Sequence, residues 1–326
     1  MKSQFVTANR GHRHRLAILI AHETPDARLK ARQAASEGGS MQVIKAKELG
    51  FCMGVRRAVD MMEAAADELG PLTSLGSTVH NPQVVAKLRN RGIEVIATID
   101  AIDARPVAIT AHGVGPQVLR DLEARGAQIV DTTCPIVTRA QQWAKKLTDE
   151  GFGVIVFGDP QHKEVRGILG WANGKVVTMR GESELDAPLP DWMPSRIGVL
   201  SQTTETEGHF ARFVQRLLTA HMDRISELRV INTLCNATTS QQAATHELAQ
   251  SVDLMIVVGG RESANTRHLA EVAREQGVET HHVEGASEIE AAWLAGRENV
   301  GVAAGASTPD AVIDDVVARL HALAPD

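Results

Sequence analysis

From Met41 onward, short runs rich in Val and Ile alternate with longer stretches in which apolar residues recur at helical spacing. Short apolar runs are typical of parallel strands buried on both faces, and the longer stretches match covering helices. We count nine strand–helix units, which form three rounds of three. The pattern therefore predicts an α/β fold of three pseudo-repeated small domains with mostly parallel sheets, covering residues 41–133, 134–231 and 232–326.

Each round presents the same kinds of residue in the same order. In the first unit, an apolar run leads to a cysteine and then to a helical segment, and D-T-T-C-P-I-V-T is a close copy of N-T-L-C-N-A-T-T. The second unit ends its strand at a glycine before a polar loop, and the third gives A-H-G-V, S-Q-T-T or A-G-A-S-T. Ligands of open α/β sheets bind at the carboxyl ends of strands, where we expect all nine loops to lie.

The three cysteines, Cys52, Cys134 and Cys235, are separated by about one small domain each. A thiolate at a helix N-terminus is stabilised by free backbone N–H groups and by the helix dipole, which makes it a good soft metal ligand. Thiolates select zinc, cuprous ion or iron–sulfur clusters, and a structural zinc normally needs four ligands at short spacings. We therefore expect one shared iron–sulfur cluster. Three cysteines on a four-iron cluster leave one iron open to a substrate oxygen, which suits reductive removal of a hydroxyl.

Short polar groups at the predicted helix N-termini favour a phosphate or diphosphate ligand, because such termini attract anions. These groups are His80, Asn81, His112, Ser263, Asn265, Ser307 and Thr308. His162 and Glu164 could combine anion contact with proton delivery, and a solvated loop pair is the competing interpretation. Thr203 could hydrogen-bond a substrate hydroxyl or cap its helix.

Composition narrows the class of protein. The formal charge of -6 and the pI near 6.1 provide no basic field for nucleic acid, and no apolar stretch has the length of a membrane span. With an odd number of cysteines and no C-x-x-C pair, we expect reduced thiols and a cytoplasmic location. We expect residues 1–40 to be a poorly ordered extension, or to precede a true start at Met41; Glu23, Asp26 and Glu37 argue against a transit peptide.

Nine motifs in one order, from about Val43 to Val316, resemble the LytB family of 4-hydroxy-3-methylbut-2-enyl diphosphate reductases. They are G-F-C-M-G-V-R-R-A-V, T-V-H-N-P-Q-V-V, A-H-G-V, D-T-T-C-P-I-V-T, H-K-E-V-R-G, S-Q-T-T, N-T-L-C-N-A-T, S-A-N-T and A-G-A-S-T-P. The resemblance implies a trefoil of three domains around one [4Fe-4S] cluster per chain, held by Cys52, Cys134 and Cys235.

The same resemblance implies an activity. The substrate would be an allylic alcohol diphosphate, which loses its hydroxyl as water on gaining two electrons and two protons, to give isopentenyl and dimethylallyl diphosphate. Glu164 would be the proton source, with Thr203 close to the substrate hydroxyl. The diphosphate would be held by His80, His112, His162, Ser263, Asn265 and Ser307. Electrons would come from a ferredoxin or flavodoxin.

This chain departs from the family pattern at two places. Where the family pattern has Asn-Ser-Ser-Asn, this chain has Glu262 to Asn265, with Ala264 in place of a serine. The missing hydroxyl is expected to reduce the binding free energy of the diphosphate by about 0.5 to 1.5 kcal/mol. Where the family pattern has H-P-E-V-E-G, this chain has H-K-E-V-R-G. We expect the charges of Lys163 and Arg166 to favour the ionised form of Glu164.

Two other functions compete with this interpretation. A cysteine-ligated zinc hydrolase or transferase acting on a diphosphate would be colourless and contain zinc. A binding or sensor protein that keeps the cluster or anion site would bind diphosphate without forming product. The cysteines themselves could be small buried hydrophobic residues, but their threefold repetition argues against that role.

Overall fold

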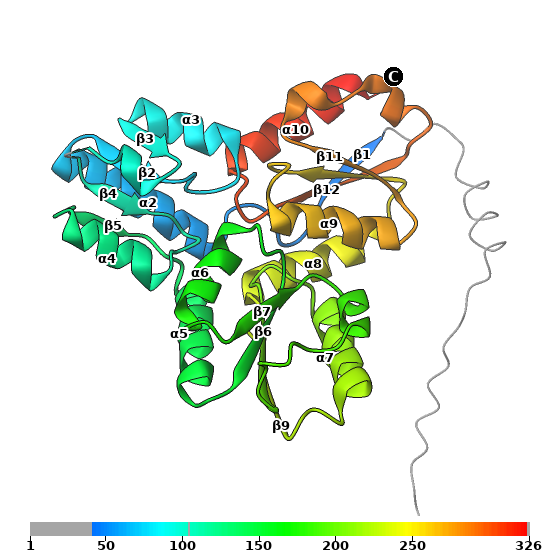
Figure 1. The fold of residues 1–326 in the computed structure, drawn as a ribbon. Helices are drawn as coiled ribbons and strands as arrows, with labels where there is room; N and C mark the ends of the chain where they lie inside the picture. The colour runs from blue at the N-terminus through cyan, green and yellow to red at the C-terminus, as the bar shows by residue number, and fades with distance from the viewer. Residues whose placement is uncertain (1–40, 104, 325–326) are drawn as a thin grey trace, which may run out of the picture. The chain divides into compact units, whose positions relative to one another are not determined.

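The computed structural model describes residues 41–103 and 105–324 (Figure 1). The expected N-terminal extension, residues 1–40, lies outside the described residues. From Ser40 onward the chain forms one compact unit with three four-stranded sheets, and every strand pair within them is parallel. This arrangement confirms the predicted α/β fold of three pseudo-repeated units. No helix of the described part of the chain is long and apolar enough to cross a bilayer.

The first sheet has the strand order β3-β2-β4-β5. Its strands are β2 (Leu72–Leu75), β3 (Ile93–Ile96), β4 (Val107–Ile109) and β5 (Ile129–Asp131). Its helical segments are α2 (Met53–Leu69), α3 (Pro82–Asn90), η1 (Ile99–Ala101) and α4 (Pro116–Ala124).

The second sheet repeats this topology with the order β7-β6-β8-β9. Its strands are β6 (Gly153–Phe157), β7 (Val176–Met179), β8 (Arg196–Ser201) and β9 (Glu227–Ile231). Its helical segments are α5 (Pro135–Asp149), α6 (Lys163–Trp171), η2 (Glu182–Asp186) and α7 (Glu207–His221).

The third sheet, read from its other end, has the equivalent order β11-β10-β12-β1. Its strands are β1 (Gln42–Lys45), β10 (Leu254–Val258), β11 (Glu279–Val283) and β12 (Asn299–Ala304). Its helical segments are α8 (Asn236–Ala249), α9 (Ala264–Glu275), η3 (Ala286–Glu288), η4 (Ala291–Leu294) and α10 (Asp310–Leu323).

The first strand does not pair within the sheet of the segment that follows it. β1 pairs with β12 in register Gln42 to Asn299, so a strand from the predicted range 41–133 completes the sheet of the range 232–326. The strand before each cysteine, β1, β5 or β9, thereby occupies the same edge of its own sheet. Because these three edges are equivalent, the three cysteines leave their sheets in equivalent positions.

The described sheets contain twelve strands, whereas the sequence pattern predicted nine. The three additional strands are β3, β7 and β11, one at an edge of each sheet. Central strands such as β6 and β10 are fully buried and read as continuous apolar runs, whereas β7 and β11 are mostly half-exposed. A half-exposed edge strand lacks a continuous apolar run. The edge strands β1, β5 and β9 were counted because each leads to a cysteine, and the pattern missed β3, β7 and β11, which do not.

The two faces of the central strands bury separate cores. In the third sheet, Leu254, Ile256 and Val258 pack with residues of α10, while Met255 and Val257 pack with residues of α8 and α9. Burying both faces of a strand removes apolar area from water at roughly 25 cal/mol per Å². The loops beyond the carboxyl ends are held close together: a Cβ on Gly260, after β10, would lie 2.0 Å from the His80 carbonyl oxygen, after β2. Only glycine permits this approach.

Candidate active site

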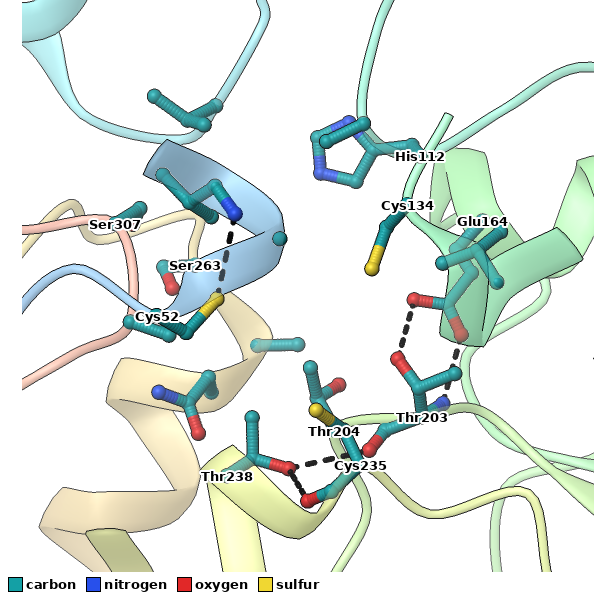
Figure 2. A pocket seen from close by; sticks show the side chains of 18 of the residues that line it. Cys52, His112, Cys134, Glu164, Thr203, Thr204, Cys235, Thr238, Ser263 and Ser307 are labelled. Carbon is teal, nitrogen blue, oxygen red and sulfur yellow. Dashed lines mark hydrogen bonds between the residues drawn. The ribbon is translucent and has the colours of Figure 1, made fainter. Parts of the chain in front are cut away.

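One pocket of about 100 Å³ lies where loops from all three sheets meet (Figure 2). Eleven of the thirteen residues that the sequence singled out for metal, substrate or catalysis line it. They are Cys52, His80, His112, Cys134, His162, Glu164, Thr203, Cys235, Ser263, Asn265 and Ser307. Residues separated by more than 250 positions in the sequence are thus brought to one cavity.

Each cysteine is the N-cap of a helix, in an extended backbone conformation: Cys52 of α2, Cys134 of α5 and Cys235 of α8. Each cysteine N–H donates to a carbonyl of the loop after the neighbouring strand, and the three bonds are equivalent. The acceptors are Ala306 for Cys52 at 3.1 Å, Ala111 for Cys134 at 3.0 Å and Thr203 for Cys235 at 2.9 Å. These bonds fix the three cysteines in the same orientation relative to their sheets.

The three sulfur atoms point into the same space (Figure 2). Gly54 shows how closely they approach, since a Cβ at this position would lie 2.6 Å from the Cys134 sulfur and 3.9 Å from the Cys52 sulfur. The first turn of α2 can therefore pack against a cysteine of another segment only because residue 54 has no side chain.

The donor set fits an iron–sulfur cluster. Burial raises the pKa of the Cys52 thiol, and the neighbouring Cys235 and Cys134 raise it further, because thiolates repel one another. A metal would relieve this repulsion by taking the place of the thiol protons. The sequence has only these three cysteines, so a tetrahedral all-sulfur zinc site cannot be completed, whereas a four-iron cluster accepts three protein thiolates and leaves one iron without one.

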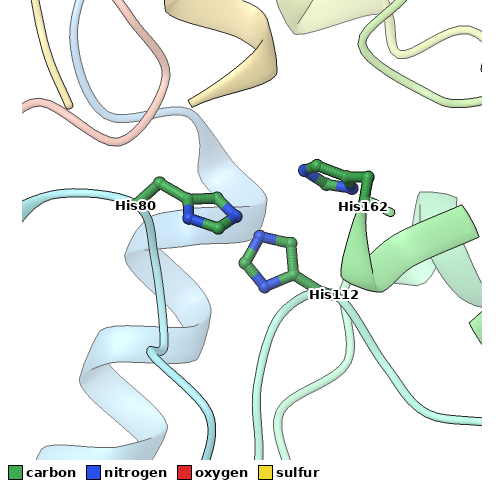
Figure 3. A group of neighbouring side chains, drawn as sticks. All are labelled: His80, His112 and His162. Atoms are coloured by element: carbon green, nitrogen blue, oxygen red, sulfur yellow. The ribbon is translucent and has the colours of Figure 1, made fainter. Parts of the chain in front are cut away.

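Three histidines form a second cluster in the same pocket (Figure 3). The ring centroid of His80 is 4.8 Å from that of His112 and 5.4 Å from that of His162. Burial lowers the pKa of His80 and of His162 to about 4, and it holds the pKa of His112 well below its usual value. All three imidazoles are therefore neutral at pH 7, and each can donate one N–H to an anion without an ion pair.

Several polar atoms of the pocket have no partner among the described residues. They include Nε2 of His80, Oδ1 of Asn265 and Oγ of Ser307, all buried. A buried polar atom without a hydrogen bond costs about 1 to 3 kcal/mol, so these atoms indicate where a polar ligand binds. Ser263 lies beside them as the N-cap of α9, with its Oγ accepting from the Thr266 N–H at 3.3 Å, and a helix N-terminus attracts anions.

Glu164 and Thr203 form a buried hydrogen-bonded pair. One Glu164 carboxyl oxygen accepts from the Thr203 N–H at 2.7 Å, and the other accepts from the Thr203 hydroxyl at 2.9 Å. The Glu164 residue is 3% exposed, and burial raises the pKa of its carboxyl to about 7 against the opposing effect of the two bonds. At neutral pH the carboxyl is thus protonated in a large fraction of molecules, as a proton donor requires.

The expected effect of Lys163 and Arg166 on Glu164 was wrong. Lys163 packs against Gly76, where a Cβ would lie 2.9 Å from its Nζ, and its charge instead lowers the pKa of His80, His112 and His162. Arg166 is exposed, and neither charge contributes to the shift of Glu164. Neighbouring residues of a helix point in different directions, so closeness in sequence did not give closeness in space.

Two polar groups that the sequence placed near the anion do not line the pocket. Asn81 caps α3, with its Oδ1 accepting from the Val84 N–H at 3.0 Å, and the Thr308 hydroxyl donates to the Val258 carbonyl at 3.0 Å. Glu262, the carboxylate noted from the sequence, lies with its Oε2 4.0 Å from the Nδ1 of His80 and is largely exposed.

Sequence reasoning missed residues that support the site from behind. The Thr238 hydroxyl donates to the Cys235 carbonyl at 2.8 Å and to the Thr203 carbonyl at 3.2 Å, which ties two pocket loops together. Gln241 donates to the Gly50 carbonyl at 2.8 Å and accepts from Nδ2 of Asn265 at 3.0 Å. The threonines and paired glutamines after Cys134 and Cys235 were the available signal, because both copies of the motif contain them.

Comparison with known proteins identifies relatives along most of the chain. A model of the LytB protein family matches residues 43–321. The 4-hydroxy-3-methylbut-2-enyl diphosphate reductase of Dehalococcoides mccartyi (strain CBDB1) is 45% identical over 283 residues, which is 87% of this chain and 99% of the relative. That of Pelobacter propionicus is 43% identical over 280 residues, 86% of this chain and 98% of the relative.

Solved structures extend the comparison. The structure of (E)-4-hydroxy-3-methyl-but-2-enyl diphosphate reductase, described as the terminal enzyme of the non-mevalonate pathway, is 35% identical, with a TM-score of 0.61 over 86% of this chain and 100% of that chain. The reductase of Plasmodium falciparum has a TM-score of 0.80 over 87% of this chain and 88% of its own; at 24% identity it supports the fold alone. The chain belongs to the LytB family.

Proposed function

We propose that this protein is a 4-hydroxy-3-methylbut-2-enyl diphosphate reductase that contains one [4Fe-4S] cluster per chain. In the proposed reaction, the substrate takes up two electrons and two protons, its C–O bond to the hydroxyl breaks, and isopentenyl or dimethylallyl diphosphate leaves together with water. The observation that carries the proposal is one pocket lined by three convergent thiols, a buried carboxyl with a raised pKa, and buried polar atoms without partners.

The cluster ligands in this proposal are Cys52, Cys134 and Cys235. When bound, the cluster supplies electrons one at a time and an iron open to a ligand. The chain orients the three sulfurs through the equivalent backbone bonds at each cysteine and leaves space for the Cys134 sulfur at Gly54.

The proposed diphosphate site is formed by the three neutral histidines together with Ser263, Asn265 and Ser307. The unpartnered Nε2 of His80 and Oγ of Ser307 support this assignment, because a diphosphate offers acceptors to N–H and O–H donors. An anion at this place would also raise the pKa of the nearby imidazoles, so it would be held more strongly as they gain protons.

Glu164 is the proposed proton donor to the substrate. Its two bonds to Thr203 fix the carboxyl in the pocket, and the Thr203 hydroxyl is placed to turn from Glu164 to a substrate hydroxyl. Because the carboxyl is buried, the proton is delivered without admitting bulk water.

We infer that the electrons come from a ferredoxin or flavodoxin in the cytoplasm. A reducing compartment keeps the three thiols free to bind iron, and the odd cysteine count without a local pair supports it.

Anaerobic turnover tests the proposal. Protein purified without oxygen is mixed with (E)-4-hydroxy-3-methylbut-2-enyl diphosphate and dithionite-reduced methyl viologen, and products are identified by mass spectrometry. The proposal predicts both isopentenyl and dimethylallyl diphosphate with loss of the viologen colour. Hydrolysis of the diphosphate by a zinc-containing, colourless preparation would instead establish the hydrolase alternative, and tight binding without product would establish the sensor alternative.

A further inference from the structure

The helices that begin at the three cysteines carry a second set of equivalent positions, on the outside of the molecule. The residue directly after each cysteine is exposed; these residues are Met53, Pro135 and Asn236. The residue five positions after each cysteine is also exposed; these residues are Arg57, Arg139 and Ser240. The exposed starts of these three helices therefore present side chains that are close in sequence to the three thiols.

Met53 is the apolar member of this surface. It is 88% exposed, more than any other large hydrophobic residue of the described ranges. It lies between Cys52 and Gly54, and a Cβ on Gly54 would point toward the sulfurs of Cys52 and Cys134. A single exposed apolar side chain is ordinary on a protein surface. Met53 therefore indicates an interaction surface only together with charged neighbours.

Two arginines supply those charges. Arg57 donates from Nη1 to the carbonyl of Thr133, the residue before Cys134, at 3.2 Å. Arg139 donates from Nη2 to the carbonyl of Asn232, three residues before Cys235, at 2.9 Å. Each guanidinium thus reaches from the helix after one cysteine to the loop before the next, and both lie beside the cysteine loops.

The positive charge of this surface is only partly compensated. Among the described residues no carboxylate forms an ion pair with Arg57 or Arg139, whereas Arg56, the neighbour of Arg57 in sequence, is 3.9 Å from Asp310. Asp131 is nearby, but its Oδ1 accepts from the N–H and hydroxyl of Thr133. In a chain with a formal charge of -6, two exposed arginines without ion pairs beside the cysteine loops are a local exception. Complementary charge steers encounters between proteins and fixes their orientation.

We propose that Met53, Arg57 and Arg139 form the docking surface for an acidic one-electron carrier protein, here called the carrier surface. The inference rests on the proposed function and names the place of the partner. None of the three lines the pocket, so the carrier surface is distinct from the residues assigned to the substrate. Each encounter oxidises the carrier by one electron and delivers that electron to the cluster; two encounters supply the two electrons that one turnover consumes.

The test removes the charge and keeps a polar side chain. Arg57→Gln with Arg139→Gln carries an amide and no charge; Arg57→Lys with Arg139→Lys is the matched control that keeps the charge. The cluster-loaded proteins are titrated with an oxidised plant-type [2Fe-2S] ferredoxin by calorimetry at low and at high salt. Turnover is then measured with the reduced ferredoxin and, separately, with reduced methyl viologen.

The carrier surface predicts that the Gln pair weakens ferredoxin binding by about tenfold or more at low salt, flattens its salt dependence, and raises the KM for ferredoxin similarly. The Lys pair stays within about threefold of the wild type, and viologen-driven turnover is unchanged in both. Unchanged ferredoxin affinity in the Gln pair would overturn the inference. So would an equal loss with viologen, since the arginines would then only hold the cysteine loops. The calorimetric titration does not depend on turnover. It therefore tests the carrier surface even if the protein does not reduce the proposed substrate.

Discussion

At the scale of single residues, the environment of Glu164 decides what its carboxyl can do. A carboxyl in water is ionised at pH 7, but here burial raises the pKa to about 7. We predict that Glu164→Gln lowers turnover by about 10²- to 10⁴-fold, because an amide has the same shape and no acidic proton. Iron content and the Kd for substrate stay unchanged. Anaerobic viologen assays and calorimetry measure these quantities, and near wild-type turnover would remove Glu164 from the proposed chemistry.

The same carboxyl predicts a pH dependence. The protonated form is the donor, and with its pKa raised to about 7 it is present at lower pH and lost as pH rises through about 7. We therefore expect kcat with reduced viologen to fall on the alkaline side, tenfold per pH unit once well above that value. Thr203→Val should move this limb to higher pH, because it removes the hydroxyl bond that lowers the pKa of Glu164. A kcat that stays constant up to pH 9 would contradict this prediction.

Ala264 is a position at which a substitution should strengthen binding of diphosphate. It lines the pocket between Ser263 and Asn265, and the resemblance to the family indicates a serine at this position. We predict that Ala264→Ser strengthens binding of inorganic diphosphate by about 2- to 10-fold, the equivalent of one added hydrogen bond. Ser307→Ala, which removes an unpartnered hydroxyl from the same pocket, should weaken binding by a similar factor. Calorimetry of the cluster-loaded protein distinguishes the two directions; equal affinities in all three proteins would place the anion elsewhere.

At the scale of elements, the helix start is the unit that builds the site, because it positions a thiol and lets a neighbour approach. We predict that Gly54→Ala lowers the iron content strongly, since the added Cβ would lie 2.6 Å from the Cys134 sulfur. Alanine favours helices over glycine, so the thermal unfolding temperature of cluster-free protein should not fall. Gly208→Ala, inside α7 with Arg212 as its near neighbour at 3.5 Å, is the matched control and should bind iron normally. Full iron content in both variants would refute the close approach at residue 54.

The elements also show where prediction from sequence succeeds. The cysteines were placed between strand and helix because the same motif recurs in all three rounds, and each cysteine is the N-cap of its helix. The edge strands β3, β7 and β11 were missed, since they are half-exposed and, unlike the edge strands β1, β5 and β9, lead to no cysteine. The direction of Lys163 was mistaken because the rotation of a side chain about its helix depends on packing that the sequence does not encode locally.

At the scale of the whole molecule, threefold repetition made the site predictable before any coordinates. In each round one cysteine lies between the strand and the helix of the first unit. Because the rounds fold alike, their thiols come to equivalent places. The pairing of the first strand with the third sheet was not visible in the sequence. β1 joins the third sheet through a pairing of residues more than 250 positions apart, which no local pattern indicates. The same long-range contacts explain why Thr238 and Gln241 escaped notice, since both act on segments distant in sequence.

The central claim is that three thiols from three parts of the chain hold one cluster. Its most direct measurement is the iron, acid-labile sulfide and zinc content of protein purified without oxygen. We predict about four irons and four sulfides per chain and no stoichiometric zinc. Substitution of any one of Cys52, Cys134 or Cys235 by serine should lower the iron content sharply. Near-zero iron in the anaerobic wild-type protein, or iron unaffected by all three substitutions, would contradict the account.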